Sequence, residues 1–233
     1  MDLSGVTVIL PALNEAAALP TALASFPPRV GLLVVDNGST DQTAAVAAAH
    51  GAQVVREPRR GFGAACWAGV QAARGEVLVF ADADGSFDGA DLPAVAGPVL
   101  AGDADLVVGS RMARRERTAM SALAVLENRA LGLACRLLFR VPLNDLGPFR
   151  AIRREVLLGL GMTDRGSGWP LEMIGRAATA GLRVVEVPVR YRSRAGGRSK
   201  VSGSVRGTVR AVSAMAAVTL ALLRERRRGR ATG

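Results

Sequence analysis

Two aspartates, Asp82 and Asp84, directly follow the apolar run VLVF at residues 77–80. Carboxylates at the end of a buried strand are hard oxygen ligands that suit Mg²⁺ or Mn²⁺. Such an ion usually keeps part of its coordination shell for substrate phosphates, where it neutralises the charge that develops on a leaving diphosphate. Aspartate is common in turns, so the pair alone is a weak signal. Its position after a strand-like run is what points to a metal site.

A third acid, Asp36, ends the apolar run LLVV and precedes the residues NGST. The dipeptide Asn-Gly signals a turn, and Ser39 or Thr40 can cap a helix that begins near Asp41. This interpretation leaves Asp36 unexplained. An acid at the carboxyl end of a parallel strand points into the crevice where open α/β sheets bind ligands. We therefore predict that Asp36 binds a ligand.

Strand-like and helix-like segments alternate along the first half of the chain, as such a crevice requires. The predicted strands are Val6–Leu10, Leu32–Asp36, Val77–Ala81 and Leu106–Gly109, and the predicted helices are Ala16–Ser25, Asp41–His50, Ala64–Arg74 and Asp91–Leu100. Strands separated by helices of this length predict βαβ units and a mainly parallel sheet. Further along, the predicted elements are helices over Met120–Phe139 and around Trp169–Ala180, and a strand over Arg183–Tyr191.

The composition is that of a globular protein. At 233 residues and 49% hydrophobic content, the chain can form one large domain, or a domain with an appendage, around a substantial core. It has 2 cysteines and no CxxC spacing, which argues against a disulfide framework or a zinc cluster. The N-terminus lacks the basic region of a signal peptide. These features predict a cytoplasmic protein.

The positive charge is concentrated at the C-terminal end. The net charge is +10, and the segment from Arg190 onward holds twelve basic residues and one acid, so it accounts for the whole excess. A nucleic-acid-binding domain is expected to carry its charge on a folded face, with aromatic residues for stacking, and aromatic content is only 4%. An anionic membrane surface suits a basic tail better, so we predict a membrane partner and no nucleic acid.

The last segment, Val205–Arg228, contains an uncharged run from Ala211 to Leu223. This run is shorter than the about 20 residues of a membrane-spanning helix. Its apolar residues fall on one helical stripe: Val205, Val209, Val212, Ala216, Leu220 and Leu223. The stripe predicts an amphipathic helix that either docks on the core or a second subunit, or lies in a membrane interface. We therefore divide the chain into a body, residues 1–203, and a basic helical tail, residues 204–233.

A series of motifs resembles the family 2 glycosyltransferases. In order, they are ILPALNE (9–15), VVDNGSTD (34–41), GFGAA (61–65), DAD (82–84) and GSR (109–111). NDLGPFR (144–150), WPLEM (169–173) and VPVRYRSRAGGRSKVSG (187–203) are similar to the branch that contains dolichyl-phosphate mannose synthase and bacterial polyprenyl-phosphate glycosyltransferases. The resemblance implies a GT-A fold, with a Rossmann-like, mainly parallel sheet flanked by helices.

The resemblance also implies a role for each candidate residue. The nucleotide-sugar would lie against Pro11, Leu13, Asn14, Glu15, Asp36, Gly63, Asp82 and Ala83, and the metal would be held by Asp82 and Asp84. The catalytic residues would be Arg111, near the diphosphate, and Asp145, beside the acceptor, and Arg194 and Lys200 would meet phosphate groups of the acceptor. Trp169 and Glu172, one turn apart on a predicted helix, are further acceptor-binding candidates. The sequence departs from the family pattern at two positions. Leu13 replaces an aromatic residue and Asn37 replaces the second acid of the usual DDGS, and both changes bear on which nucleobase the enzyme prefers.

Several of these residues also have a purely structural interpretation. Glu15 can favour the helix N-terminus that follows it, GFGAA can be a tight turn into a helix, and Trp169 with Pro170 can pack at a helix start. For Asp145 the chemistry leaves alternatives open. A phosphate acceptor is largely ionised near neutral pH, because its second pKa is about 6. A general base then has little to do, and Asp145 can instead orient the acceptor or bind the metal or the sugar hydroxyls.

These inferences predict an inverting, metal-dependent enzyme that moves a hexose from a GDP- or UDP-linked sugar to a polyprenyl phosphate at the cytoplasmic membrane face. One alternative is a soluble glycosyltransferase with a small-molecule acceptor, whose tail serves homodimer formation. Another is a non-catalytic protein that binds anionic membranes or nucleic acid through its basic end. Asp36, Asp82, Asp84 and Arg111 argue against the latter, because binding alone does not require such a cleft.

Overall fold

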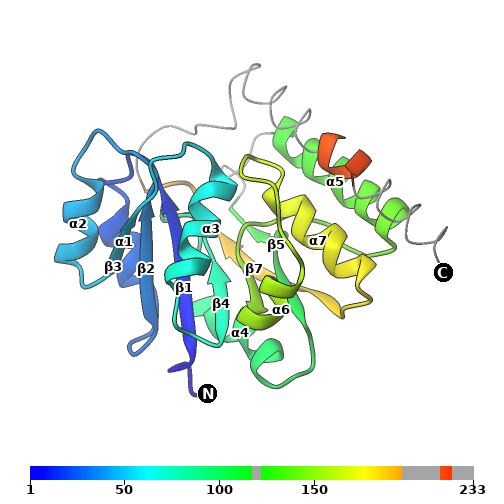
Figure 1. Cartoon of the computed structure of the whole chain (residues 1–233), viewed down its shortest axis with the longest axis horizontal. Helices are drawn as coiled ribbons and strands as arrows, with labels where there is room; N and C mark the ends of the chain where they lie inside the picture. Colours follow the sequence, from blue (N-terminus) through cyan, green and yellow to red (C-terminus); the bar gives the residue numbers. More distant parts are fainter. Residues whose placement is uncertain (117–121, 196–215, 222–233) are drawn as a thin grey trace.

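A seven-stranded sheet forms the centre of the molecule (Figure 1). The structure is a computed structural model that describes residues 1–116, 122–195 and 216–221. In spatial order, the strands are β3 (Gln53–Arg56), β2 (Gly31–Asp36), β1 (Val6–Ala12), β4 (Val77–Phe80), β6 (Arg150–Arg153), β5 (Leu106–Arg115) and β7 (Val184–Tyr191). Within this sheet β6 alone runs antiparallel to its neighbours. The predicted mainly parallel α/β sheet is confirmed.

Helices cover both faces of the sheet, which is why β1, β2, β4 and the first half of β5 are nearly continuous apolar runs. Side chains alternate between the faces along each strand, so Val8 and Ile9 belong to different cores. The helices on the Ile9 side are α3 (Phe62–Ala72), α5 (Ala122–Phe139), α6 (Arg154–Gly159) and α7 (Trp169–Thr179). Those on the Val8 side are α1 (Leu19–Ala24), α2 (Thr43–Ala49) and α4 (Leu92–Leu100), the last preceded by the 3₁₀ turn η1 (Gly89–Asp91).

The sequence pattern missed β3, β6 and α6. β3 has four residues, QVVR, and lies half-exposed at the edge of the sheet, so it lacks an apolar signal. β6 has an arginine at each end, but its middle residues, Ala151 and Ile152, are fully buried between β4 and β5. Both strands are therefore defined by pairing with their neighbours, not by a local pattern.

Strand β5 is longer than predicted. It was expected to end at Gly109, but it continues to Arg115 because its second half pairs with β7. The pairing is irregular between Ser110 and Arg114. In this stretch the backbone N–H of Arg111 donates to the carboxylate of Asp145.

The predicted C-terminal helix lies mostly outside the described residues. Within residues 216–221, which are helical, Val218 is buried and lies against Gly168 at the start of α7. Leu220, which belongs to the predicted apolar stripe, is 54% exposed. In the part of the chain that the structure covers, no helix combines the length and the apolar character needed to span a bilayer.

Candidate active site at the carboxyl edge of the sheet

Most residues predicted to act on substrate gather at one edge of the sheet, where the parallel strands end. Here β1 and β4 are neighbours, although the chain reaches β4 only after β2 and β3. Strand order therefore reverses between them, and open α/β sheets bind ligands at such a switch point. β6 runs the other way, so the loop before it reaches the same edge. The residues at this edge are Asn14, Glu15, Asp36, Asp82, Asp84, Arg111, Asp145 and Arg194.

The loop after β1 is held by the loop after β2. Ser39 Oγ accepts the N–H of Asn14 and Thr43 Oγ1 accepts the N–H of Glu15, each at 2.9 Å. In return, Asn14 Oδ1 accepts the N–H of Thr40 at 2.7 Å. Asn14 has φ 52°, in the left-handed region that asparagine tolerates better than most residues. The predicted capping role of Ser39 or Thr40 is wrong, because both residues bind the neighbouring loop and α2 begins later, at Thr43.

Three further residues predicted to bind the nucleotide-sugar surround this clamp. Pro11 lies within β1, opposite Val35 of β2. Leu13 follows β1 and is half-buried. Asp36 is buried at the end of β2, and its Oδ1 accepts the N–H of Ser39 at 2.9 Å. The three side chains are thus close to the clamped loop at the ends of β1 and β2.

Asn37 uses its whole amide group to fix the loop before α3. Its Nδ2 donates to the carbonyls of Glu57, at 2.9 Å, and Arg59, at 2.7 Å. Its Oδ1 accepts the N–H of Gly61 at 2.9 Å. A carboxylate could not donate to the two carbonyls, so this loop requires an amide at the position where the resembling family has an acid.

Asn37→Asp should therefore lower the free energy of unfolding by about 2 kcal/mol or more at pH 7. The substitution removes two donors and leaves buried carbonyls facing a charge. Urea unfolding measures the loss. It should shrink below about pH 4, where a protonated carboxyl can donate one bond again. The matched control is Gln53→Glu on the exposed surface of β3, which should change the value by less than about 0.5 kcal/mol. Equal losses in the two variants would contradict the role given to the amide.

Asp82 and Asp84 follow β4 as predicted, with Ala83 buried between them. Asp84 Oδ1 accepts the N–H of Ser86 at 2.9 Å, and its Oδ2 lies 3.3 Å from Nη1 of Arg194. Burial and, next, the negative charge of Asp84 raise the pKa of Asp82 to about 7, against the opposing charges of Arg111 and Arg194. The pair therefore concentrates negative charge in a place that disfavours it.

Arg194 bridges two acids of the site. Besides Asp84, its guanidinium contacts Glu15, with Nη2 2.9 Å from Oε1. The backbone of the next residue, Ala195, donates to the carbonyl of Asp84 at 3.0 Å. The start of the basic loop is thus fastened to the acidic edge. Lys200, the other basic residue predicted for this loop, lies outside the described residues.

Arg111 and Asp145 form a buried bidentate ion pair. Nε and Nη2 of Arg111 donate to the two carboxylate oxygens at 2.8 and 2.7 Å, and the backbone N–H of Arg111 donates to Oδ2 at 2.8 Å. Nη2 also reaches Asn128 Oδ1 of α5 at 3.0 Å, and the guanidinium stands 5.3 Å from the ring centre of Tyr191. Burial lowers the pKa of Arg111, but the bonds and charge of Asp145 outweigh burial and raise it. Arg111 therefore remains a cation.

A second buried arginine, Arg150, supports the loop that carries Asp145. It is 2% exposed and donates to the carbonyls of Leu146, Gly147 and Pro170 at 2.6–2.9 Å. Burial lowers its pKa to about 10. Arg150 ends the motif NDLGPFR, and no role was predicted for it. Arg150 is the first residue of the short strand β6, which lies between the apolar strands β4 and β5 in the sheet.

The comparison with family models decides the assignment. Residues 7–160 match the family described as Glycosyl transferase family 2, which is more than half of the chain. The chain belongs to glycosyl transferase family 2. The family inferred from the motifs is confirmed.

The glycosyltransferase is similar to three curated relatives, two of which bear names of the predicted branch. It is 50% identical over 210 residues, 89% of this chain and 94% of the relative, to an uncharacterized glycosyltransferase of Mycobacterium tuberculosis. It is 37% identical over 216 residues, 84% of this chain and 81% of the relative, to the polyprenol monophosphomannose synthase of Mycolicibacterium smegmatis. It is 32% identical over 219 residues, 87% and 89% of the two chains, to the undecaprenyl-phosphate mannosyltransferase of Micrococcus luteus.

A solved structure confirms the GT-A-like fold of the glycosyltransferase. The glucosyl-3-phosphoglycerate synthase from Mycobacterium tuberculosis, in complex with Mn²⁺ and uridine-diphosphate-glucose, superposes with a TM-score of 0.73 at 28% identity. The likeness covers 92% of this chain and 78% of that chain. The same synthase in complex with phosphoglyceric acid also gives a TM-score of 0.73, at 26% identity.

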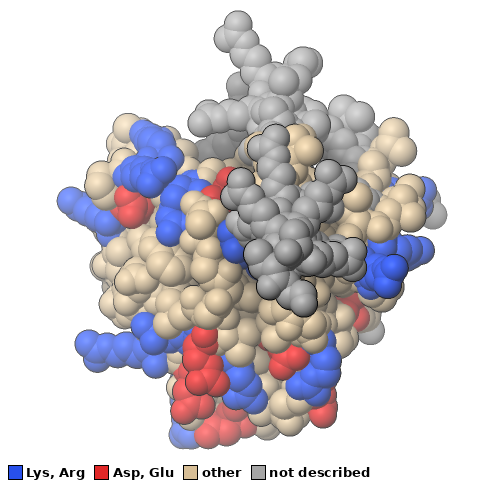
Figure 2. All heavy atoms as spheres, turned by 45° about the vertical axis from the view of Figure 1, so that its right-hand side comes forward, with Lys and Arg blue, Asp and Glu red and all other residues tan. Residues whose placement is uncertain are grey.

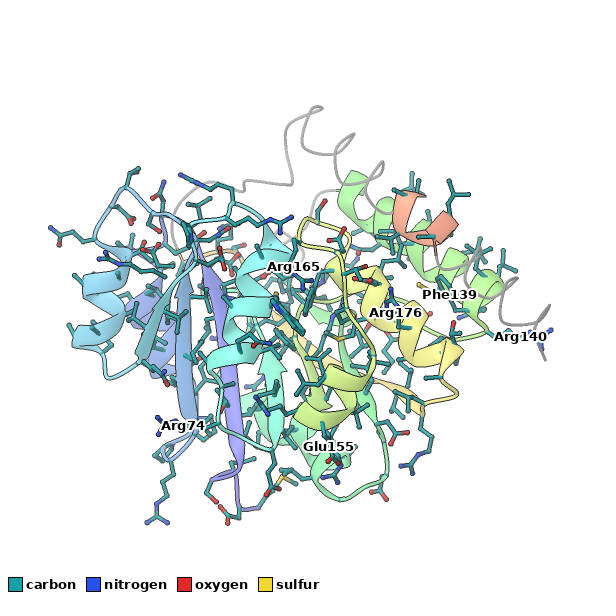
Figure 3. The ribbon with its side chains drawn as sticks, in the orientation of Figure 1. Arg74, Phe139, Arg140, Glu155, Arg165 and Arg176 are labelled. Atoms are coloured by element: carbon teal, nitrogen blue, oxygen red, sulfur yellow. The ribbon has the colours of Figure 1, made fainter. Side chains whose placement is uncertain are left out.

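Two residues predicted to bind the acceptor lie in the interior of the glycosyltransferase. Trp169 is 1% exposed at the start of α7. Its ring packs against the rings of Trp67 and Phe80, with 6.2 Å between ring centres in each pair. Glu172, one turn later, accepts the backbone N–H groups of Thr163 and Asp164 and the side chain of Arg176. Figure 3 shows Arg176 on α7 and Arg165 between α3 and α7. Both predicted residues therefore organise the loop between α6 and α7 in this structure.

Gly63, predicted to bind the nucleotide-sugar, packs its backbone against the same loop. Gly61 has φ 146° and precedes α3, so the structure contains the tight turn into a helix that the sequence analysis considered. The N–H of Gly63 donates to the carbonyl of Gly166 at 2.8 Å. A Cβ at Gly63 would lie 2.7 Å from the carbonyl oxygen of Asp164 and 2.9 Å from the backbone of Arg165. The space between α3 and this loop thus admits only glycine.

Gly63→Ala is expected to lower the free energy of unfolding by about 1–3 kcal/mol, because the added methyl group meets backbone atoms that must move. Chemical denaturation measures the effect. The matched control is Gly159→Ala at the end of α6, where a Cβ meets nothing within 4 Å, and it should be neutral or slightly stabilising. If Gly63→Ala leaves the free energy of unfolding unchanged, the loop between α6 and α7 can move to accommodate the methyl group, and the proposed steric restriction is wrong.

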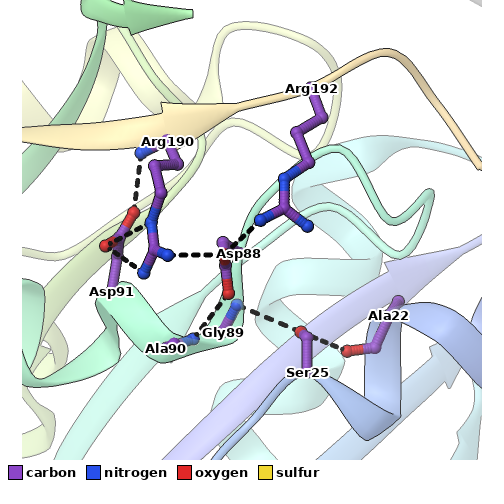
Figure 4. A network of polar contacts seen from close by, with 8 residues as sticks. All are labelled: Ala22, Ser25, Asp88, Gly89, Ala90, Asp91, Arg190 and Arg192. Carbon is purple, nitrogen blue, oxygen red and sulfur yellow. Dashed lines mark hydrogen bonds and ion pairs between the residues drawn. The ribbon is translucent and has the colours of Figure 1, made fainter.

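A network of ion pairs, which the sequence did not reveal, connects β7 to the loop after β4 (Figure 4). Arg190 makes two bonds to Asp91, at 2.8 and 3.0 Å, and reaches Asp88 at 2.9 Å. Arg192 reaches the same Oδ2 of Asp88 at 2.6 Å. The segment from Arg190 onward was treated as a source of free positive charge, but Arg190, Arg192 and Arg194 are all paired with acids of the body.

Proposed function

We propose that the glycosyltransferase moves a hexose from a nucleotide-sugar to a polyprenyl phosphate, with inversion at the anomeric carbon. The observation that carries the proposal is the close placement of two opposite charges at one sheet edge: the Asp82–Asp84 carboxylates and the Arg111 cation held by Asp145. A diphosphate leaving group needs both a metal site and a fixed cation. The names of the relatives from Mycolicibacterium smegmatis and Micrococcus luteus support the acceptor class.

Asp82 and Asp84 fit Mg²⁺ or Mn²⁺. Burial and, next, the negative charge of Asp84 raise the pKa of Asp82, and a bound cation would offset both effects. Across residues 1–116, 122–195 and 216–221, no group of three or more Asp, Glu, His or Cys side chains is placed to hold a metal. Two carboxylates suit an ion that completes its shell with diphosphate oxygens and water. When bound, this ion supplies a Lewis acid for the leaving group, as the Mn²⁺, Mg²⁺ and UDP complexes of the Mycobacterium tuberculosis synthase support.

We assign the donor to the clamped loops and the leaving group to Arg111. The nucleoside lies between the ends of β1 and β2, beside Asn14 and Asp36. Arg111 stabilises the negative charge on the diphosphate, and Asp145 keeps its guanidinium in place. An oxygen of the acceptor phosphate attacks the anomeric carbon, and the electron pair of the broken bond leaves with the nucleoside diphosphate. The acceptor is already ionised near neutral pH, so the step requires no general base.

We place the acceptor phosphate beside Arg194 and Lys200, with Trp169 and Glu172 supporting this side of the site through the loop between α6 and α7. Arg194 would have to exchange its contacts with Glu15 and Asp84 for the phosphate. The enzyme would act at a membrane surface, where residues 204–233 would add attraction to anionic lipids. Homodimer formation through this tail is the alternative role.

A second candidate function is transfer to a small phosphorylated acceptor. Its support is the fold likeness to the glucosyl-3-phosphoglycerate synthase, which has been crystallised with phosphoglyceric acid. Such an acceptor also presents an ionised oxygen, so the chemistry of the two candidates is the same. They differ in whether the acceptor carries a lipid chain.

A transfer assay tests the proposal. The full chain is incubated with UDP- and GDP-linked hexoses, Mn²⁺ or EDTA, and one of two acceptors, a polyprenyl phosphate in detergent or phosphoglyceric acid. We expect a glycolipid product with Mn²⁺ and none with EDTA. A thermal-shift screen with UDP and GDP identifies the base, since a ligand stabilises by its binding free energy. A product with phosphoglyceric acid alone would replace the first candidate by the second, and no product with either would contradict both.

A further inference from the structure

Helix α5 lies at the periphery of the molecule (Figure 1) and carries exposed leucines. Leu126, Leu133 and Leu137 are 64%, 55% and 71% exposed. They are seven and four residues apart, so they lie along one line of the helix. Most other large apolar side chains that the structure describes are buried. A contiguous apolar row in water indicates a contact surface.

An arginine follows each of these leucines after three residues. Arg129, Arg136 and Arg140 are all exposed. Residues three apart are neighbours on a helix surface, so Arg129 and Arg136 form a basic row beside the apolar row, and Arg140 directly follows the last residue of α5. Figure 3 shows Phe139 and Arg140 at the far end of α5, with Arg140 at the outer edge of the molecule. From residue 122 to residue 140 the sequence holds these three basic residues and one acid, Glu127.

A pocket of about 300 Å³ lies between the basic row and β5. Arg115, Arg129 and Arg136 contribute its cationic lining, and Leu133 and Leu143 contribute apolar lining. Pockets that bind small ligands begin at about this size. Its lining suits a phosphate group joined to aliphatic carbons, which is the chemistry of a phospholipid headgroup.

We propose that this outer face of α5 docks on a membrane of anionic phospholipids. The face, here named the α5 stripe, consists of Leu126, Arg129, Leu133, Arg136, Leu137 and Arg140. The leucines enter the acyl boundary and the arginines bind lipid phosphates, as in a helix that lies in a membrane interface. The inference rests in part on the proposed function, whose acceptor is a membrane lipid. It adds a surface in the folded body, whereas the charge of the sequence predicted membrane contact through the tail.

The charge pattern favours a membrane over a second copy of the chain. In a twofold dimer the stripe would face itself, and like-charged rows brought together are costly. An anionic bilayer supplies the missing negative charge. Figure 2 shows that most acidic surface on the face drawn there lies along its lower rim, accompanied by basic side chains. Within α5 the sequence holds a single acid, Glu127, so the helix does not neutralise its own arginines in the same way.

Vesicle binding by the full chain tests the α5 stripe. Vesicles of phosphatidylcholine, with or without phosphatidylglycerol, are mixed with the protein at moderate salt and separated by flotation. Arg129→Gln with Arg136→Gln should weaken binding to the anionic vesicles about fivefold per arginine, since each contributes about 1 kcal/mol near such a surface. Leu126→Gln with Leu137→Gln should weaken it at least about tenfold, because two apolar side chains no longer leave water.

Single substitutions provide matched controls. Arg74→Gln removes the same charge at an exposed site on the opposite rim of the molecule, as Figure 3 shows, and is compared with Arg136→Gln. Leu158→Gln changes a 37% exposed leucine on α6 and is compared with Leu137→Gln. Neither control should weaken vesicle binding. The side chains changed in these single variants are all exposed: Arg74, Arg136, Leu137 and Leu158. The thermal unfolding temperatures of the four variants should therefore stay close to that of the wild type.

The outcomes separate this inference from the proposed function. If stripe variants and controls bind vesicles like the wild type, the inference is overturned and any lipid binding belongs elsewhere. If the leucine variants change the oligomeric state and leave vesicle binding unchanged, the stripe is an interface between copies, and the inference is again overturned. If the wild type transfers no sugar to polyprenyl phosphate in detergent but binds anionic vesicles through the stripe, the proposed function fails and the inference stands.

Discussion

Asp82→Asn is expected to lower the rate of transfer about 10³-fold or more, and at the same time to stabilise the metal-free protein at pH 8. The loss follows from removing one of two carboxylates proposed to anchor a metal, whose Lewis acidity contributes several kcal/mol to the transition state. The gain follows from the electrostatics of the two neighbouring carboxylates. Burial and the charge of Asp84 raise the pKa of Asp82 from an ordinary value of 3.8 to about 7.

The sign of the stability effect depends on pH. Between about pH 4 and pH 7 the folded protein keeps a proton on Asp82 that the unfolded chain has lost, so raising the pH through this range reduces wild-type stability. Asparagine never ionises and avoids this loss. Without metal, the variant should therefore be more stable than the wild type at pH 8, and the advantage should vanish below about pH 4.

Differential scanning calorimetry at several pH values measures both parts. Added Mn²⁺ with UDP should raise the unfolding temperature of the wild type and leave that of the variant nearly unchanged. Asp103→Asn is the matched control, since it removes the same charge from an exposed position and should alter neither activity nor metal response. A variant that keeps its Mn²⁺-dependent stabilisation would rule out Asp82 as a metal ligand.

Asp145→Asn is expected to lower kcat about 10²–10³-fold and to destabilise the fold by about 3 kcal/mol. Both oxygens of Asp145 accept N–H groups of Arg111, and an amide can accept at only one of them. The buried guanidinium then loses part of its partner, which is costly, and drifts from the position it needs at the diphosphate. The matched control is Asp105→Asn, whose pair with Arg183 is exposed and should contribute less than about 1 kcal/mol.

A pH–rate profile distinguishes positioning from proton transfer. If Asp145 only holds Arg111, the ratio of wild-type to variant rates should stay constant from pH 6 to pH 9. Arg111→Lys should then show a similar loss, because a lysine cannot make the two parallel bonds. A loss that deepens steadily as the pH falls toward 6, where the acceptor phosphate becomes protonated, would mean that Asp145 takes up the acceptor proton.

Residues that end apolar strands were predictable from the sequence. Asp36, Asp82 and Asp84 were placed correctly at the sheet edge, because alternation of apolar runs and helices predicts parallel strands whose carboxyl ends share one side. Strand β6 was not predictable in this way, since it carries an arginine at each end and exists through pairing with β4 and β5. Asp145 was named by resemblance alone, and its partner could not be named at all.

The charge of the C-terminal part illustrates the limit of reading a linear sequence. Counting residues placed the whole positive excess beyond Arg190. In the folded chain, Arg190, Arg192 and Arg194 contact Asp91, Asp88 and Asp84, which are about a hundred residues away in sequence. Ion pairs of this separation depend on β7 lying beside β5 and on the course of the loop after β4, which no local pattern encodes.

The sequence by itself determined the fold class and the edge of the sheet at which the chemistry would lie, because these depend on local periodicity and on side chains next to strand ends. Its motifs indicated the family by resemblance. Only the tertiary structure decided which charges are paired, that Trp169 and Glu172 are buried in the interior, and that Asn37 must be an amide. The physical reason is that hydrogen bonds, ion pairs and burial join residues distant in the chain. Their partners are set by how the sheet and its helices pack.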